Sequence, residues 1–382
     1  MKNLIDSWQI KLAEKLAQKE CPIIASPGTI EKQTLKILPE CKNSYLVFVD
    51  GHFDLSLSSP PSGLVIQSLE ASMPSYGLFL QNRWNQSLQK EKEEDVLLNA
   101  SVAKDSLFLY VPPKFLASLP LQIHHVFTSQ ETAFSRIEMI LGIGSSLSMI
   151  QTFQPLVDSP AYNVAWNATV EAGASFSLYN HALLKSTSKT VDSLRAQIKK
   201  DANLSLLHAT RGGALAKLSA QVELFQENSS ANLRSLGMLD AASYFDCQFL
   251  AHHIAPLCTS SQHVKNALLD ESRSNFEGKI YVEREAQKTQ SYQLNQNLLL
   301  SNLARAESKP GLEIFADDVK ASHGAIISQL SDEELFYLAS RGLSKEIAKM
   351  LLVIGFCKEI SDFIPNDSCK LELLDEMKRW IN

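Results

Sequence analysis

The chain has 382 residues, more than one compact core usually holds, so we expect two or three domains or one elongated repeat domain with appendages. Lysine and arginine number 36 against 42 aspartates and glutamates, which gives a formal net charge of −6. This acidic balance argues against nucleic acid as a partner. No stretch approaches the roughly 18 apolar residues of a membrane span, and charged residues interrupt the apolar N-terminus. The sequence therefore predicts a cytoplasmic protein without a membrane segment.

The cysteines agree with a reducing compartment. Their spacing is irregular and no C-x-x-C pair occurs among Cys21, Cys41, Cys247, Cys258, Cys357 and Cys369. We therefore expect six reduced, mostly buried thiols.

The N-terminal region is expected to mix helices and strands. Residues 1–42 are predicted to be helical, because apolar side chains recur at helical spacing at Ile5, Trp8, Leu12 and Leu16. Residues 45–53 read as a strand running into a tight turn, with Asp50-Gly51 as the hairpin signal. The charged run at residues 90–95 is interpreted as a solvated turn or helix face. The prolines at 112 and 113 end this region, which we place at residues 1–115.

A repeat occupies residues 116–328. Five-residue segments with a small, a polar and then an apolar residue begin at Ser145, Ala174, Ala202 and Ala231, and Ser260-Ser261 follows, with spacings of 28 or 29 residues. Each unit is too small to bury its own apolar face and must stack on its neighbours. This predicts a β-solenoid, most simply a right-handed parallel β-helix with two or three short strands per coil. An antiparallel β-sandwich with chance regularity is the alternative.

Helix signals return in residues 329–382. Ser331 and Glu334 have the spacing of a capping box, Gly342 stands where a glycine would end the helix, and Ser344 can cap a second helix. A third helix is expected to carry Leu371, Leu374 and Ile381. The sequence thus predicts a helical hairpin and tail, detached from the repeat.

Catalytic signatures are scarce. The chain lacks both a phosphate-binding loop and the G-x-S-x-G motif of serine hydrolases. The pairs His124-His125 and His252-His253 are adjacent, and adjacent side chains of a strand point to opposite faces, so neither pair can chelate one ion. Asp317 and Asp318 supply too few oxygens for calcium. His323 lies at the end of the repeat, where a solenoid edge would face a partner, and a neutral imidazole is a suitable iron ligand. A purely structural histidine is the alternative.

Several segments, taken in order, resemble the SufB/SufD family of iron–sulfur cluster assembly proteins, and its SufD branch in particular. They are residues 46–51, 95–100, 107–112, 276–280, 286–289, 298–301 and, as the most specific stretch, 309–342. The resemblance implies a right-handed parallel β-helix between two helical regions. It also implies a non-catalytic scaffold that pairs with SufB through the β-helix and binds the SufC ATPase through the C-terminal helices.

In that scheme SufC supplies the nucleotide chemistry, and ATP-driven motion exposes the site of cluster assembly at the SufB–SufD interface. His323 matches the histidine that would hold the transient Fe–S cluster there. The SufC contact is expected to include part of the apolar stripe formed by Leu335, Phe336, Leu338, Ile347, Leu351 and Phe356. Deleting residues 331–382 is expected to abolish SufC binding and leave the β-rich core intact.

One position departs from the resemblance. The family usually has a cysteine two residues before the histidine, whereas this chain has Ala321, which can neither bind iron nor accept sulfur. Thiolate ligands would then come from SufB, or the site would use imidazole alone. Competing interpretations are a β-helix enzyme acting on polysaccharide and an interaction scaffold without iron, and a homodimer is possible where SufB is absent.

Overall fold

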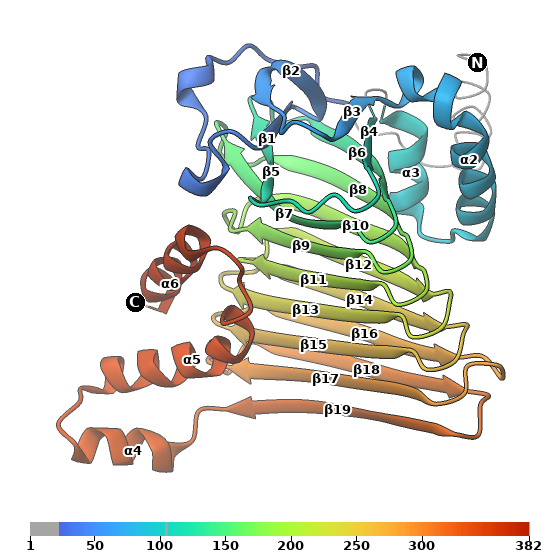
Figure 1. The fold of residues 1–382 in the computed structure, drawn as a ribbon. Coiled ribbons are helices and arrows are strands. Elements are labelled where there is room, and N and C mark those ends of the chain that lie inside the picture. The colour runs from blue at the N-terminus through green and yellow to red at the C-terminus, as the bar shows by residue number, and fades with distance from the viewer. Residues whose placement is uncertain (1–22, 104–105, 382) are drawn as a thin grey trace.

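A parallel β-solenoid forms the body of the molecule (Figure 1), as predicted. The computed structural model describes residues 23–103 and 106–381. Strands from β5 onward alternate between two facing sheets, so each coil contributes two strands, and neighbouring coils pair in parallel. Stacking of this kind satisfies the backbone hydrogen bonds of every strand except those at the ends of the stack.

The first sheet has ten strands and the second has nine. The first sheet contains β19 (Val319–Gln329), β17 (Thr289–Leu299), β15 (Thr259–Leu268), β13 (Ser230–Leu239), β11 (Asn203–Thr210), β9 (Ser175–Ala182), β7 (Ser146–Pro155), β5 (Leu121–Phe127), β1 (Tyr45–Val49) and β2 (His52–Ser59). The second contains β18 (Arg305–Ile314), β16 (Arg273–Val282), β14 (Tyr244–His253), β12 (Leu215–Leu224), β10 (Lys189–Ile198), β8 (Ala161–Val170), β6 (Thr132–Leu141), β4 (Leu107–Val111) and β3 (Val65–Ser68).

The counted repeat falls on alternate strands of the first sheet. Leu147, Phe176 and Leu204 occupy equivalent inward positions of successive coils, as predicted. The fourth copy is displaced by two residues, because Leu204 pairs with Ala231 and not with the expected Leu233. A shift of two residues keeps the same side chains facing inward, so the alternation alone could not reveal it.

The N-terminal segment agrees with the sequence only in part. The expected stripe at Ile5 to Leu16 lies outside the described residues. Residues 23–42 are not helical: they are extended apart from the 3-10 turns η1 (Lys32–Thr34) and η2 (Pro39–Cys41). Pro27 and Pro39 cannot occupy a helix interior, which explains the difference. The hairpin is confirmed, since β1 and β2 pair antiparallel across Asp50 and Gly51, both at positive φ.

Two further helices, α2 (Leu69–Lys90) and α3 (Glu94–Val102), cover the outer face of the second sheet at its N-terminal end. Three helices follow the last coil: α4 (Asp332–Ser340), α5 (Lys345–Ser361) and α6 (Asp367–Ile381). The predicted caps are present, because the hydroxyls of Ser331 and Ser344 accept hydrogen bonds from the backbone at Glu334 and Ile347. No helix among the described residues is both long and apolar enough to cross a membrane.

The C-terminal helices are not detached from the repeat. The buried side chains of α5 and α6 are Ala348, Val353, Cys357, Ile360, Cys369, Leu373, Met377 and Trp380. Most of these pack against outward-facing apolar residues of the first sheet, including Tyr179, Leu207 and Leu236. The predicted third helix is confirmed as α6, which carries Leu371, Leu374 and Ile381, although Leu371 is exposed and Leu373 is buried. Only the packing partner could identify which face of α6 is covered. Removal of residues 331–382 would therefore strip this apolar face of its cover.

Candidate partner-binding edge of the solenoid

Within the described part of the chain, no further strand caps the last coil of the solenoid. β18 and β19 end their respective sheets, so each pairs with a neighbouring strand on one side only. The large apolar side chains of Phe315, Ile326 and Ile327 are exposed near this edge. Exposed edge strands of this length offer unpaired backbone groups to another chain, and solenoids normally cover their ends. The edge is therefore a candidate binding surface for a partner that supplies the next strands.

The interior changes character close to this edge. The inward side chains of β17 are Thr289, Ser291, Gln293, Asn295, Asn297 and Leu299, of which all but the last are polar and buried. On β15 the inward positions Ser260, Gln262 and Asn266 are likewise polar and buried. Buried polar groups are costly unless they are hydrogen-bonded, and these residues bond largely to one another.

One hydrogen-bonded chain begins at His253 on β14. Its Nε2 lies 2.9 Å from the hydroxyl of Ser260, which in turn shares a hydrogen bond with the hydroxyl of Ser291. Burial lowers the pKa of His253 to about 4, so its imidazole is neutral at physiological pH. This series of hydrogen bonds leads from the interior towards the last coil, where Ala321 is the in-register neighbour of Ser291.

The amide side chains of Asn297 and Gln293 also form hydrogen bonds to neighbouring strands. Asn297 accepts hydrogen bonds from Asn266 and Ser274 and donates to Asn295 at 2.7 Å. The side chain of Gln293 donates to Gln262. These contacts join β15, β16 and β17 through side chains as well as through the backbone.

His323 lies on β19 directly beside Gln293 of β17, in an in-register parallel pair. The alternation of β19 places His323 in the same side-chain column as Gln293, on the side of the strand that faces the solenoid interior. Because no further coil covers it, its side chain is exposed. Its predicted position at an exposed solenoid edge is thus confirmed, whereas its role as a ligand stays a prediction. Within residues 23–103 and 106–381, no three His, Cys, Asp or Glu side chains gather in a metal-binding group.

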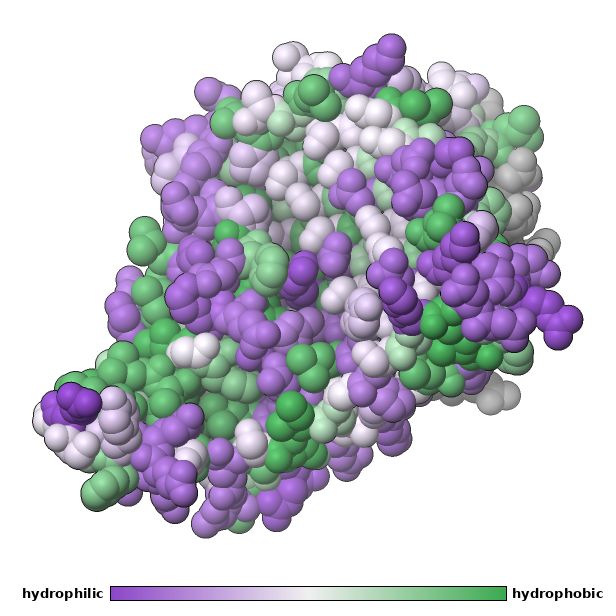
Figure 2. Space-filling model, turned by 60° about the horizontal axis from the view of Figure 1, so that its bottom comes forward, coloured by the Kyte–Doolittle hydropathy of each residue, from purple (hydrophilic) through white to green (hydrophobic). Residues whose placement is uncertain are grey.

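The residues expected to contact SufC divide between two environments. Phe336 on α4 is 76% exposed, and Ile347 and Leu351 on α5 are also exposed. Leu335 and Leu338 are half-buried. Phe356 instead packs towards the solenoid, where the Nζ of Lys265 lies 4.5 Å from its ring centroid. Figure 2 shows hydrophobic side chains gathered where α4 and α5 project from the molecule.

Tyr337 belongs to the exposed surface of α4 and was missed from the sequence. Its ring is 57% exposed beside Phe336. The helical period alone places this tyrosine outside the predicted apolar stripe. Only the structure shows that α5 partly covers Leu335 and Leu338 and leaves Phe336 and Tyr337 exposed together.

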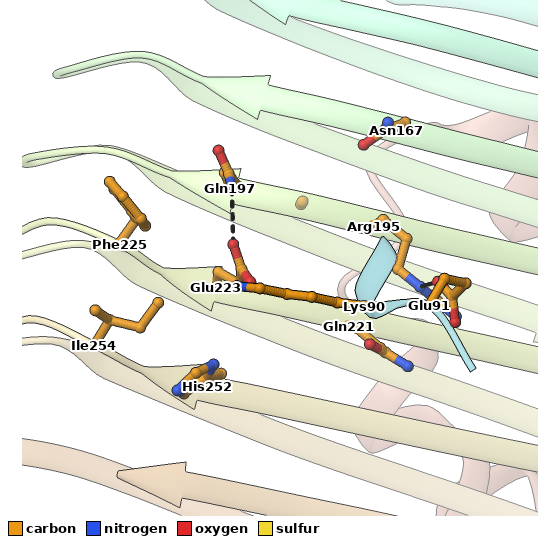
Figure 3. Close-up of a pocket in the computed structure, with 11 residues that line it drawn as sticks. Lys90, Glu91, Asn167, Arg195, Gln197, Gln221, Glu223, Phe225, His252 and Ile254 are labelled. Carbon is orange, nitrogen blue, oxygen red and sulfur yellow. Dashed lines mark hydrogen bonds and ion pairs between the residues drawn. The ribbon is translucent and has the colours of Figure 1, made fainter. Parts of the chain in front are cut away.

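A pocket of about 160 Å³ lies on the outer face of the second sheet (Figure 3). Its side chains come from successive coils, with Arg195, Glu223 and His252 among them, and from the segment between α2 and α3. Arg195 pairs with Glu91 at 2.7 Å and with Glu93 at 3.0 Å. The charged run at 90–95 is therefore not a simple solvated turn, because Glu91 is buried against the sheet. Sequence patterning could not anticipate this, since Arg195 lies about a hundred residues away.

The remaining histidines and cysteines follow the sequence expectations. His124 contacts Thr152 and Gln154 whereas His125 stacks on Phe48, and His252 pairs with Glu283 whereas His253 contacts Ser260, so the two side chains of each pair meet different groups. The five described cysteines are buried and free. Burial raises the pKa of the Cys247 thiol well above its ordinary value, which makes it an unreactive group.

Comparison with known families gives the class of protein. The core-domain model of the SufBD proteins, described as SUF system FeS cluster assembly, matches residues 125–356, and the SufBD N-terminal region matches residues 36–123. The chain therefore belongs to the SufBD family of iron–sulfur cluster assembly proteins.

Individual relatives refine this placement. The chain is 29% identical over 378 residues to the iron–sulfur cluster assembly protein SufD of Escherichia coli strain K12, which covers 97% of this chain and 86% of that protein. It is 28% identical over 358 residues to a SufBD family protein of Synechocystis, covering 86% of this chain and 76% of the relative. A SufBD family protein of Mycobacterium leprae is 36% identical over 173 residues, 43% of this chain and 44% of that protein. The chain is a SufD homologue that spans nearly the whole length of its bacterial relative.

Proposed function

We propose that this chain is a non-catalytic scaffold subunit of an iron–sulfur cluster assembly complex. In this proposal it pairs with SufB through the open edge of the solenoid and binds SufC through α4 and α5. The observation that carries the proposal is the uncapped last coil, which presents two edge strands and exposed apolar side chains around His323. The free thiols of the described cysteines are compatible with action in the cytoplasm.

Strand addition is the binding mode that this edge supports. A partner with the same solenoid fold could add its own strands to β18 and β19, with backbone hydrogen bonds supplying affinity and Ile326 and Ile327 supplying apolar contact. SufB, as a paralogue of SufD, is a partner of that kind. A second copy of this chain would offer the same edge, so homodimers are expected where SufB is absent.

His323 is the residue of this edge that we propose to contact the nascent cluster. An imidazole nitrogen is a suitable ligand for iron, and the exposure of the side chain leaves it accessible to a partner. Ala321, two residues earlier on the same strand face, offers no ligand atom. The cluster is thus the cargo of the complex, and thiolate ligands at this point would come from SufB.

The exposed face of α4 and α5 is the proposed SufC contact. Phe336, Tyr337, Ile347 and Leu351 are exposed on two helices whose remaining apolar residues partly cover one another. Aromatic residues at the centre of a contact commonly dominate its binding energy. In this arrangement SufC would supply the nucleotide hydrolysis for which this sequence has no phosphate-binding loop.

The edge contact is tested by co-purification of the full-length chain with SufB and SufC. Ile326→Arg should abolish SufB binding, because it places a charge in the proposed apolar contact. Leu119→Arg is the matched control, since Leu119 is 49% exposed and Ile326 is 46% exposed, but Leu119 lies near the opposite end of the solenoid. Retained SufB binding by the Ile326→Arg protein would refute this placement of the interface.

The SufC contact is tested by substitution, because deletion of residues 331–382 would also uncover the first sheet. Phe336→Ala should weaken SufC binding at least tenfold, in the range of an aromatic hot spot. Leu371→Ala, at another exposed apolar residue on α6, should bind SufC normally. Equal loss in both proteins would point to a contact elsewhere on the C-terminal helices.

A further inference from the structure

The amide side chains near the open edge form a ladder with a fixed direction. Gln262 donates a hydrogen bond from Nε2 to the backbone oxygen of Lys279 at 3.1 Å, and Gln293 donates from Nε2 to Oε1 of Gln262 at 2.6 Å. Gln293 therefore directs its NH2 group back to the preceding coil, and Gln262 directs its NH2 group across to β16 of the facing sheet. The ladder ends in an acceptor, the Oε1 of Gln293.

That terminal acceptor is buried and lacks a partner. Gln293 is 3% exposed, and among the described residues no donor bonds to its Oε1. The amide is held closely, because a Cβ atom at Gly278 on the facing sheet would lie 1.9 Å from its Nε2. The missing side chain of Gly278 provides the room for the amide. A buried carbonyl oxygen without a hydrogen bond is destabilising, so a donor beside it is favoured.

His323 is the adjacent residue that can supply this donor. Gln293 and His323 are in-register neighbours in a parallel pair, so their side chains leave the sheet on the same face, about 4.8 Å apart along the column. Among the described residues His323 has no hydrogen-bond partner of its own. The flanking inward residues are already engaged: Ser291 bonds to Ser260, and Oδ1 of Asn295 accepts from Asn297.

We propose that Gln293 is the positioning residue for His323: the two side chains are not hydrogen-bonded in the structure, and a turn of the exposed imidazole lets the Gln293 Oε1 accept a hydrogen bond from one imidazole N–H. A neutral imidazole that donates through one nitrogen leaves the other unprotonated, and this second nitrogen faces away from the interior, out of the open edge. Ligand histidines are commonly oriented by a carbonyl acceptor in this way. The inference deepens the proposed function, on which it rests, by explaining how a histidine on an exposed strand is held for a cluster.

The hydrogen bond is tested first in the isolated full-length chain, by NMR with 15N-labelled histidine. An imidazole N–H exposed to water exchanges too quickly to be observed, whereas a hydrogen-bonded one is protected. We expect one protected N–H resonance that disappears in His323→Asn and is thereby assigned. It should be lost in Gln293→Leu and in Gln293→Met, which is closer in shape, and retained in Gln293→Glu, whose carboxylate also accepts.

Gln290→Leu serves as the matched control, because Gln290 lies on the exposed outer side of the same strand. Its spectrum should keep the His323 resonance. Circular dichroism and thermal unfolding establish that each variant is folded before its spectrum is interpreted. A resonance that persists in folded Gln293→Met, or that is absent from the wild-type protein, overturns the positioning role.

A second measurement separates this inference from the proposed function. On the complex with SufB and SufC, iron and sulfide content should fall roughly tenfold in Gln293→Met, in line with the loss of an outer hydrogen bond to a ligand histidine. If His323→Asn abolishes cluster formation while Gln293→Met changes neither the resonance nor the iron content, the proposed function stands and the positioning role is refuted. If His323→Asn assembles clusters normally, the proposed ligand role fails, while the N–H resonance still reports on the hydrogen bond.

Discussion

The middle and the end of the solenoid have the same backbone but opposite interiors. In the middle coils the inward positions hold Phe176, Leu204 and Leu206, within one continuous apolar core. Three coils after Leu204 and Leu206, the equivalent positions hold Ser291 and Gln293, each hydrogen-bonded to the coil before it. An apolar end would expose an aggregation-prone surface whenever the partner is absent, whereas water can hydrate a polar end. The contrast shows that coils closed by neighbours use hydrophobic burial, and coils that open to a partner use hydrogen-bonded side chains.

The middle coils also hold a buried polar cluster around Asp192. Asp192 accepts hydrogen bonds from the hydroxyl of Tyr162 at 2.7 Å and from Gln151 at 3.0 Å, and Gln151 also accepts from Trp166. Burial raises the pKa of Asp192 to about 7, against the lowering effect of these hydrogen bonds. Asp192 and the inward polar residues of β17 are both buried, but those of β17 lie one coil from the open edge.

The largest effect should come from the apolar middle. Phe176→Ala removes a fully buried ring, and we expect it to lower the free energy of unfolding by about 3 to 5 kcal/mol. Ser291→Ala, in the same inward column but one coil from the open edge, should cost only about 1 kcal/mol, the net value of one hydrogen bond. Urea denaturation of both variants measures the difference. Similar losses in the two proteins would contradict the division into two interiors.

Asp192 should make stability depend on pH. Its folded pKa of about 7 lies above the ordinary value of 3.8, so its stabilising contribution is complete below about pH 4 and is lost as pH rises through 7. Relative to Asp192→Asn, the wild-type protein should lose up to roughly 4 kcal/mol across this interval. Unfolding midpoints of the two proteins at pH 5 and pH 8 test the sign. A gap that does not change with pH would exclude this titration.

Near the polar end, replacing an exposed side chain should cost little stability, whereas replacing a residue of the hydrogen-bonded network should cost more. Asn297→Ala leaves the donors of Asn266 and Ser274 without their acceptor, and should cost about 2 kcal/mol. Gln290→Ala on the exposed side of the same strand should stay within about 0.5 kcal/mol. Thermal unfolding compares the pair. A harmless Asn297→Ala would mean that water replaces the network readily.

His323→Ala should have a small effect on folding and a large effect on function. The exposed side chain adds little by burial, so the change in stability should be about 1 kcal/mol, the net value of the hydrogen bond proposed to Gln293, while cluster formation on the reconstituted complex should fall sharply. Ala321→Cys, which introduces a thiol on the same strand face, should be tolerated. Unfolding of His323→Ala, or normal cluster formation, would make the histidine structural or incidental.

Local chemistry made several features of this fold predictable. The capping serines 331 and 344, the Asp50-Gly51 turn and the alternation of the repeat depend on neighbours within a few residues, and all are present in the structure. The two-residue displacement of the fourth repeat escaped detection for a related reason: alternation identifies a face but carries no information on register.

Only part of the candidate site could be predicted from the sequence. His323 could be placed at the end of the repeat, because a solenoid is filled in chain order and its last coil must be an edge. The proposed acceptor beside it, Gln293, could not be predicted from the sequence. Gln293 meets His323 on one side and Gln262, 31 residues away, on the other only when the coils stack in register. Likewise, the burial of Glu91 depends on Arg195, which a distant coil supplies.

The sequence by itself determined the β-solenoid, its helical C-terminus and its family, because hydrophobic period, caps and family-specific segments are properties of short stretches. Only the tertiary structure decided which helix faces are covered, which charges pair and where the interior becomes polar and opens. Those features arise from contacts between coils and between helix and sheet, whose free energies depend on residues that are neighbours in space alone.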